Sequence, residues 1–294
     1  MERAVTAIQD SLRYLLADFI GDDDATPPSL PAGLPESVAA IAVEAVDLLT
    51  DYQSAGYARL YVERLGRFVG RPEVDAAMLA EIARLMAMRM SYQDPIRIAH
   101  LKLAAFERGV PPSTEVHRFR WDELVGALPV LAADPLLTVL GWLGWLHKRV
   151  AIPYSSKTSF GVRRLRLEAA LRRWRLFSGR YEEERLWVER WLHMISRALV
   201  KQPAATPAIV ETATMVQGFG DVYRRGLADW HAIINGLAKP TFDGTLPLSD
   251  LAAAIAEARA AAMPDVRQAA LKRTIAEIRA RALAEAANAN AAAE

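Results

Sequence analysis

An arginine-rich segment, residues 157–180, contains the residue types and spacing best suited to binding chemistry in this sequence. It has eight cations and one acid, Glu168, so its net charge is 8 − 1 = +7 in a chain whose total is +1. Arginine pairs with carboxylate and phosphate groups through parallel hydrogen bonds, and it stacks on flat rings. The residues that we expect to contact a partner or an anion are Lys157, Arg163, Arg164, Arg166, Arg172, Arg173 and Arg175.

Three interpretations of this basic segment remain open. It could contact an acidic protein or an anionic ligand, or it could bind nucleic acid, since Trp174 and Phe177 lie among the arginines. It could also be a solvated helix face whose cations pair with acids such as those at 182–184. The near-neutral total charge provides no global field toward nucleic acid or a membrane surface. We therefore expect a polypeptide or anionic partner before nucleic acid, and no membrane.

Other kinds of chemistry find little support. The chain has no cysteine, which excludes disulfides, thiolate metal sites and cysteine nucleophiles and suits a cytoplasmic protein. None of its five histidines has another histidine three or four residues away. No G-x-S-x-G elbow or Walker-type phosphate loop occurs, and Gly218-Phe219-Gly220 is a lone G-x-G that we interpret as a break between helices. We expect no catalytic, metal-binding or cofactor-binding residue in this chain.

Helical periodicity dominates the sequence, and we expect an all-α, multi-helix globular array of about ten to twelve helices without strands. Three N-cap and proline pairs, Asp94-Pro95, Asp134-Pro135 and Thr206-Pro207, predict helix starts. The apolar stretch 124–146 contains Pro129, Asp134 and Pro135, so it predicts two short buried helices and not a membrane span. The expected helices cover 2–20, 36–51, 53–69, 74–90, 95–108, 135–147, 160–176, 181–201, 207–217, 221–237, 248–262 and 265–287.

The expected domain organisation follows from composition. Residues 1–35 should form an N-terminal helix and a linker rich in proline and aspartate, and 36–287 a helical domain with a sub-boundary near 148–159. Residues 288–294 should form a disordered tail. Trp187, Trp191 and Trp230 have helical spacing and apolar neighbours, so we interpret them as core or interface anchors.

An ordered set of short segments resembles a known family. The segments are Asp51-Tyr52-Gln53, Tyr57-Ala58-Arg59-Leu60-Tyr61, Arg84-Leu85-Met86, Ser91-Tyr92-Gln93-Asp94, Lys157 to Gly161, Tyr181-Glu182-Glu183-Glu184-Arg185, Gly218-Phe219-Gly220-Asp221 and Arg225-Gly226-Leu227. Their order is similar to the C-terminal helical region of the indolepyruvate ferredoxin oxidoreductase beta-subunit family, over roughly residues 36–285. The α/β domain that precedes this region in the family is not found in this sequence.

The resemblance implies an oxidoreductase complex that decarboxylates arylpyruvates oxidatively, forms an acyl-coenzyme A and reduces ferredoxin. It implies thiamine diphosphate, iron–sulfur clusters and coenzyme A for the complex, held by other domains. This chain would then be a non-catalytic helical subunit or domain that contacts the other subunits. The alternative is a stand-alone helical regulatory or binding protein that uses residues 157–180 for nucleic acid or an acidic partner.

Overall fold

The computed structural model describes residues 26–128, 130–218, 220–262 and 267–293. These described residues form two compact units: 26–70 with 86–186, and 71–85 with 187–293. The sub-boundary expected near 148–159 therefore lies inside the first unit. One transition, at 70/71, falls in the loop before α4 (Ala76–Met90), and the other two fall within α4 and α9 (Gly179–Lys201). The expected helix at 2–20 lies outside the described residues, and 26–35 contain no helix.

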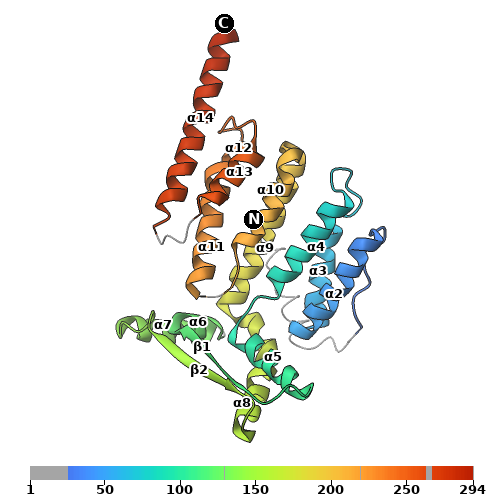
Figure 1. Cartoon of the computed structure of the whole chain (residues 1–294), viewed down its shortest axis with the longest axis vertical. Helices are drawn as coiled ribbons and strands as arrows, with labels where there is room; N and C mark the ends of the chain where they lie inside the picture. Colours follow the sequence, from blue (N-terminus) through green and yellow to red (C-terminus); the bar gives the residue numbers. More distant parts are fainter. Residues whose placement is uncertain (1–25, 129, 219, 263–266, 294) are drawn as a thin grey trace. The chain divides into compact units, whose positions relative to one another are not determined.

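Helices dominate the first unit and confirm the all-α expectation there (Figure 1). They are α2 Glu36–Tyr52, α3 Ala55–Gly66, α5 Pro95–Glu107, α8 Ser159–Ala170 and the 3-10 segment η1 Leu171–Phe177, together with the end of α4 (Ala76–Met90) and the start of α9 (Gly179–Lys201). Local capping fixes three starts. Ser54, Asp94 and Thr158 each accept a hydrogen bond from the backbone N–H three residues later.

A two-stranded antiparallel ribbon interrupts these helices, contrary to the expectation of no strands. β1 (Thr114–Arg120) pairs with β2 (Arg149–Ser155), Thr114 opposite Ser155 and Arg120 opposite Arg149. Its inward residues include Phe119 and Tyr154, whose rings lie 6.5 Å apart. The sequence did not predict it because residues 121–148 separate the strands, so no hairpin turn marks the pairing.

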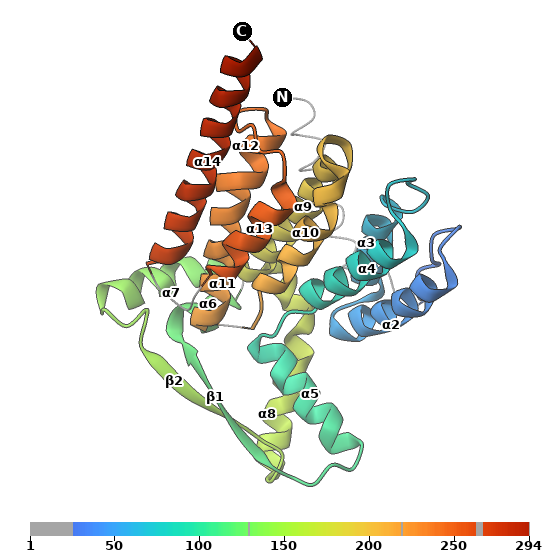
Figure 2. The same cartoon turned by 45° about the horizontal axis from the view of Figure 1, so that its top comes forward.

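Two short helices, α6 (Trp121–Gly126) and α7 (Val130–Trp142), lie between the strands at the Arg120–Arg149 end of the ribbon, as Figure 2 shows. The expectation that this stretch is buried is wrong: the Trp142 side chain is 87% exposed. The helix also begins before the expected cap, so Pro135 lies inside α7. No helix among the described residues is long and apolar enough to span a bilayer.

The regular elements described in the second unit are all helices. It contains residues 76–85 of α4, residues 187–201 of α9, η2 Pro203–Ala205, α10 Thr206–Glu211, η3 Thr212–Met215, α11 Gly220–Ile233, the π-helical η4 Ile234–Ala238, α12 Lys239–Phe242, α13 Leu251–Ala260 and α14 Ala269–Ala293. Thr206 is the first residue of α10, and its cap is Ala205, so the third predicted N-cap is wrong as well. The 3-10 turn η2 leads directly into α10, so the Thr206 backbone is already helical and does not have the extended conformation of an N-cap.

The three tryptophans form the core of the second unit, as expected. Trp187 stacks on Trp191 with ring centres 6.2 Å apart, and Trp230 meets Trp187 edge-on at 5.2 Å. The Trp230 indole N–H donates to the Thr212 hydroxyl at 3.0 Å, so its polar atom is satisfied inside the core. At the C-terminus α14 continues to Ala293, where a disordered tail was expected. Alanine has the highest helix propensity of the amino acids, which accounts for the extension.

Candidate functional site

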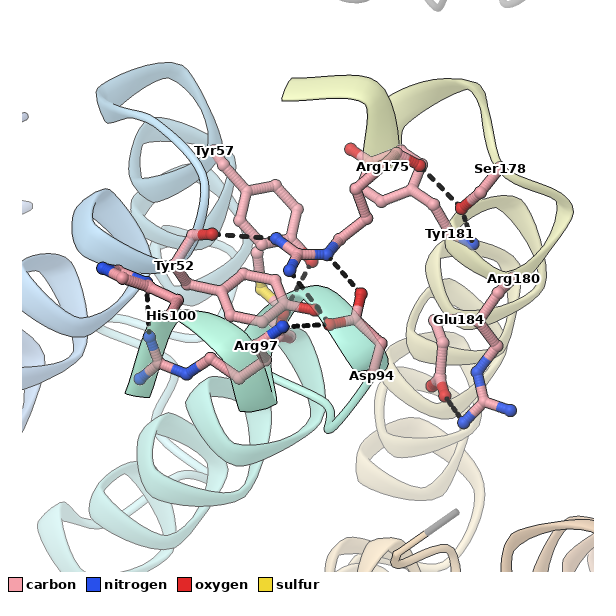
Figure 3. Close-up of polar contacts among 11 residues, drawn as sticks. Tyr52, Tyr57, Asp94, Arg97, His100, Arg175, Ser178, Arg180, Tyr181 and Glu184 are labelled. Carbon is pink, nitrogen blue, oxygen red and sulfur yellow. Dashed lines mark hydrogen bonds and ion pairs between the residues drawn. The ribbon is translucent and has the colours of Figure 1, made fainter. Parts of the chain in front are cut away.

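The arginine-rich segment divides into a buried part and an exposed part. Arg175 is buried, and its guanidinium donates from Nε to Asp94 at 2.6 Å and from Nη2 to the same carboxylate at 3.1 Å (Figure 3). A third hydrogen bond goes from Nη1 to the Tyr52 carbonyl at 2.8 Å. The expectation that Arg175 contacts a partner is therefore wrong. A buried charge requires partners inside the protein, and Arg175 has them.

Tyrosine rings enclose this buried ion pair. The Arg175 guanidinium lies 4.0 Å from the centre of the Tyr52 ring, and the Tyr92 ring lies 5.8 Å from that of Tyr52. Tyr57 donates its hydroxyl hydrogen to the Met90 carbonyl at 2.9 Å. The hydroxyls of Tyr52 and Tyr92 are buried and accept or donate no hydrogen bond within the described part of the chain.

The electrostatics of this cluster favour structure over acid–base chemistry. Burial raises the pKa values of Tyr52, Tyr57 and Tyr92, so the phenols stay neutral at physiological pH. Burial acts to lower the pKa of Arg175, but the tyrosines and the hydrogen-bonded Asp94 carboxylate raise it above its usual value. The three phenols and the Arg175 guanidinium therefore keep their protons near neutral pH. The cluster therefore holds η1 against α2 and α5.

A second buried ion pair lies beside the first. Glu184 in α9 pairs with Arg89 in α4 and, at 2.8 Å, with Arg180 one helical turn earlier. Arg89 and Glu184 are both buried. The Arg180 guanidinium also lies 5.4 Å from the centre of the Tyr92 ring, which joins the two pairs into one polar cluster.

Two further arginines of the predicted set are engaged within the first unit. Arg164 pairs with Glu168 at 2.7 Å and lies 5.8 Å from the centre of the Tyr154 ring. Arg172 donates to the Asp51 carbonyl at 3.2 Å. The side chain of Arg173 lies outside the described part of the structure. These contacts orient α8 and η1 and leave fewer cations for a partner than the sequence suggested.

The exposed part of the segment is a face of α8 and η1 that combines cations with apolar side chains. Lys157, Arg163 and Arg166 are exposed and have no ion-pair partner in the described part of the chain. Phe160 is 78% exposed and Leu167 67% exposed. The next exposed apolar residues along the same face are Leu171 and Trp174. Positions separated by three, four and seven residues share one side of a helix, so these side chains form a continuous stripe.

Sequence reasoning missed the buried polar cluster altogether. Its members come from three separate stretches of the chain, 52–57, 89–94 and 175–184, and Arg175 and Asp94 are 81 residues apart. The only available signal was that Tyr52, Tyr92, Asp94 and Glu184 all occur in the segments that carry the family resemblance. Among the described residues no three histidine, aspartate or glutamate side chains lie close enough together to hold a metal ion.

Comparison with known proteins gives one family. The model of a family described as "Family of unknown function (DUF6537)" matches residues 38–236, from α2 into η4. Comparisons with curated proteins and with solved structures found no match. The matched range includes the buried polar cluster and the exposed stripe on α8.

Proposed function

We propose that this chain, which belongs to the DUF6537 family, is a non-catalytic helical subunit or domain that binds another polypeptide of a larger assembly. The observation that carries the proposal is the exposed face of α8 and η1, where Phe160 and Leu167 lie beside Arg163 and Arg166. Contiguous exposed apolar surface bordered by polar residues is typical of protein-binding sites.

The chemistry of this face favours an acidic, amphipathic partner segment. Phe160, Leu167 and Trp174 offer an apolar stripe that would take the buried side of a partner helix or loop. Arg163 and Arg166 would pair with carboxylates at the edge of the contact, which sets orientation and association rate more than affinity. The buried Arg175–Asp94 pair holds η1, which carries part of this face, against the start of α5.

The assembly that we propose is a 2-oxoacid:ferredoxin oxidoreductase of the indolepyruvate type. The support is the ordered set of sequence segments, several of which contribute to the buried polar cluster through Tyr52, Tyr92, Asp94 and Glu184. In such a complex other chains or domains would hold thiamine diphosphate and iron–sulfur clusters and would bind coenzyme A. This chain would act in assembly or in contact with an anionic group.

Co-purification from a native extract tests both parts of the proposal. The wild-type chain is expected to recover a polypeptide that contains thiamine diphosphate and iron–sulfur clusters, identified by mass spectrometry and cofactor analysis. A variant with Phe160→Asp and Leu167→Asp should lose it. Val200→Asp is the matched control, because Val200 is an equally exposed apolar residue on α9. Recovery by all three proteins would refute the α8 site, and recovery by none would refute the proposed assembly.

A second candidate function follows from the exposed cations and Trp174, which also suit single-stranded nucleic acid. Salt-dependent binding to generic DNA or RNA would favour a stand-alone binding protein. Loss of that binding on Arg163→Ala and Arg166→Ala, with a fall in the salt slope of roughly 0.7 per phosphate contact removed, would place it on this face. Binding that ignores these substitutions would exclude this function.

A further inference from the structure

The helix α7 presents a second exposed apolar face, which lacks the charges of the α8 face. Trp142 is 87% exposed and Val139 53% exposed, and Leu136 and Leu143 are also exposed. Leu136, Val139 and Leu143 are separated by three and four residues, so they lie on one side of the helix. After α7, Gly144 adopts a positive φ of 65°, and the Trp145 N–H donates back to the Leu140 carbonyl at 2.8 Å. This turn brings the backbone of Trp145, whose side chain is exposed, back to the end of the helix.

Residues 135–146 contain no ionisable side chain. The one hydroxyl of this stretch, that of Thr138, donates its hydrogen to the Asp134 carbonyl at 2.9 Å, so its donor is already used within the helix. Charged groups occur only at the borders, at Asp134 and from His147 onward. The Lys148 ammonium lies 4.8 Å from the centre of the Trp145 ring, at the rim of the face. An apolar contact could therefore cover the face without stranding a charge.

The place of α7 in the first unit keeps this face accessible. The helix packs against α6 at the Arg120–Arg149 end of the β1–β2 ribbon, whereas α8 lies at the Thr114–Ser155 end (Figure 2). The pairing register fixes the ribbon, so α6 and α7 have a defined position at the Arg120–Arg149 end. Two faces of different chemistry thus lie at opposite ends of one ribbon.

The exposed area is of the size that a symmetric dimer requires. The five apolar side chains are 42–87% exposed, and a whole aromatic side chain has about 150–250 Å², so together they present roughly 500 Å². Contiguous apolar patches on monomers reach about 300–600 Å² and are often functional. Two such faces in contact would bury roughly 1,000 Å² in total, which is the level at which specific interfaces begin.

The charge distribution distinguishes the occupants of the two faces. The α8 face has three exposed cations, so a second copy of the same face would repel it. The α7 face has no charge to match or to repel, and a face that meets its own copy about a two-fold axis presents the same apolar set on both sides. We propose that the uncharged face of α7 binds the α7 face of a second copy of this chain. This inference does not rest on the proposed oxidoreductase complex.

Sedimentation velocity of the full chain across about 1 to 100 µM tests the proposal, because that range covers the dissociation constants expected for a contact of this size. The wild type is expected to dimerise. Trp142→Asp and Val139→Asp should each weaken the dimer by at least ~30-fold, since central apolar anchors dominate such interfaces. Phe160→Asp, on the α8 face, is the control and should leave the dimer unchanged. Both sites are exposed, so circular dichroism should show all variants folded.

Disulfide trapping tests the symmetry of the contact. The chain has no native cysteine, so Val139→Cys introduces a single thiol. Near a two-fold axis that thiol should link to its own copy on mild oxidation and yield a covalent dimer, whereas Phe160→Cys should not. A chain that stays monomeric at every concentration would overturn the proposal, as would a dimer that survives both aspartate variants. Binding to lipid vesicles without self-association would overturn it in favour of a lipid surface.

Discussion

Replacement of Arg175 by methionine should destabilise the first unit severely, because it leaves a buried carboxylate without its main partner. Methionine keeps much of the length and apolar volume of the side chain, so the change removes charge and hydrogen bonds more than packing. Asp94 is buried, and it would lose two hydrogen bonds, at 2.6 and 3.1 Å, and keep, among the described residues, the one from the backbone N–H of Arg97.

The expected cost is about 3–5 kcal/mol, the usual penalty when one partner of a buried ion pair is removed. Loss of the 2.8 Å hydrogen bond to the Tyr52 carbonyl contributes to the same total. Arg166→Met is the matched control. Arg166 lies on the same segment but is exposed and unpaired in the described part, so its replacement should change stability by less than about 0.5 kcal/mol.

A double-mutant cycle isolates the ion pair. Asp94→Asn removes the charge but keeps a residue that caps α5 as well as aspartate does. The single Asp94→Asn variant leaves the Arg175 guanidinium buried without its counter-charge. The double variant, Asp94→Asn with Arg175→Met, leaves no unpaired charge. It should therefore be less destabilised than the sum of the single variants by about 0.5–3 kcal/mol.

Hydrogen exchange measured by mass spectrometry, with urea as the perturbant, is the suitable assay. A chain with two compact units need not unfold in one step, so a single melting curve would mix their stabilities. Peptides from α2 and α5 report the opening free energy of the first unit directly. The reasoning would be refuted if Arg175→Met cost no more than Arg166→Met, or if the double variant equalled the sum of the singles.

Two further predictions concern the second unit. Burial and then Arg190 lower the pKa of His231 below its usual 6.5. The unfolded chain therefore binds more protons there below about pH 6.5, and stability should fall as pH drops through that value toward the folded pKa. His231→Gln should flatten this dependence of the opening free energy on pH, measured by hydrogen exchange of second-unit peptides; an unchanged slope would contradict the assignment. A Cβ on Gly226 would lie 2.0 Å from the Met215 carbonyl oxygen, whereas one on Gly179 would meet nothing within 4 Å. Gly226→Ala should cost about 1–3 kcal/mol and Gly179→Ala should be neutral or mildly stabilising. Hydrogen exchange of peptides from the unit that contains each glycine would show this, and equal effects would refute the close approach.

The sequence predicted the helices well where local chemistry sets them. The Asp94-Pro95 pair marked the start of α5 correctly, since the cap, the proline and the first turn are adjacent in the chain. The Asp134-Pro135 pair does not mark a helix start, because α7 already begins at Val130 and Pro135 lies inside it. The prediction of Thr206 as an N-cap is wrong because the 3-10 turn η2 leads directly into α10, whose cap is Ala205.

The β1–β2 ribbon and the exposure of α7 escaped sequence reasoning for a different reason. Pairing of Thr114 with Ser155 depends on two strands that residues 121–148 separate, and no turn residue indicates it. An apolar stretch such as α7 indicates burial only on average, and the sequence does not say whether the protein or a partner provides the cover. The exposed Trp142 shows that the described chain does not.

By itself the sequence determined the helical class, most helix positions, the tryptophan core of the second unit and the location of the basic segment. Each depends on periodicity, capping or composition, which operate within one segment of the chain. Only the tertiary structure decided which cations are available to a partner. Arg175 is buried because Asp94, 81 residues away, and the Tyr52 ring surround it, whereas Arg166 on the same segment meets water. Burial and pairing of a charge are properties of residues brought together by folding, and spacing along the chain does not record them.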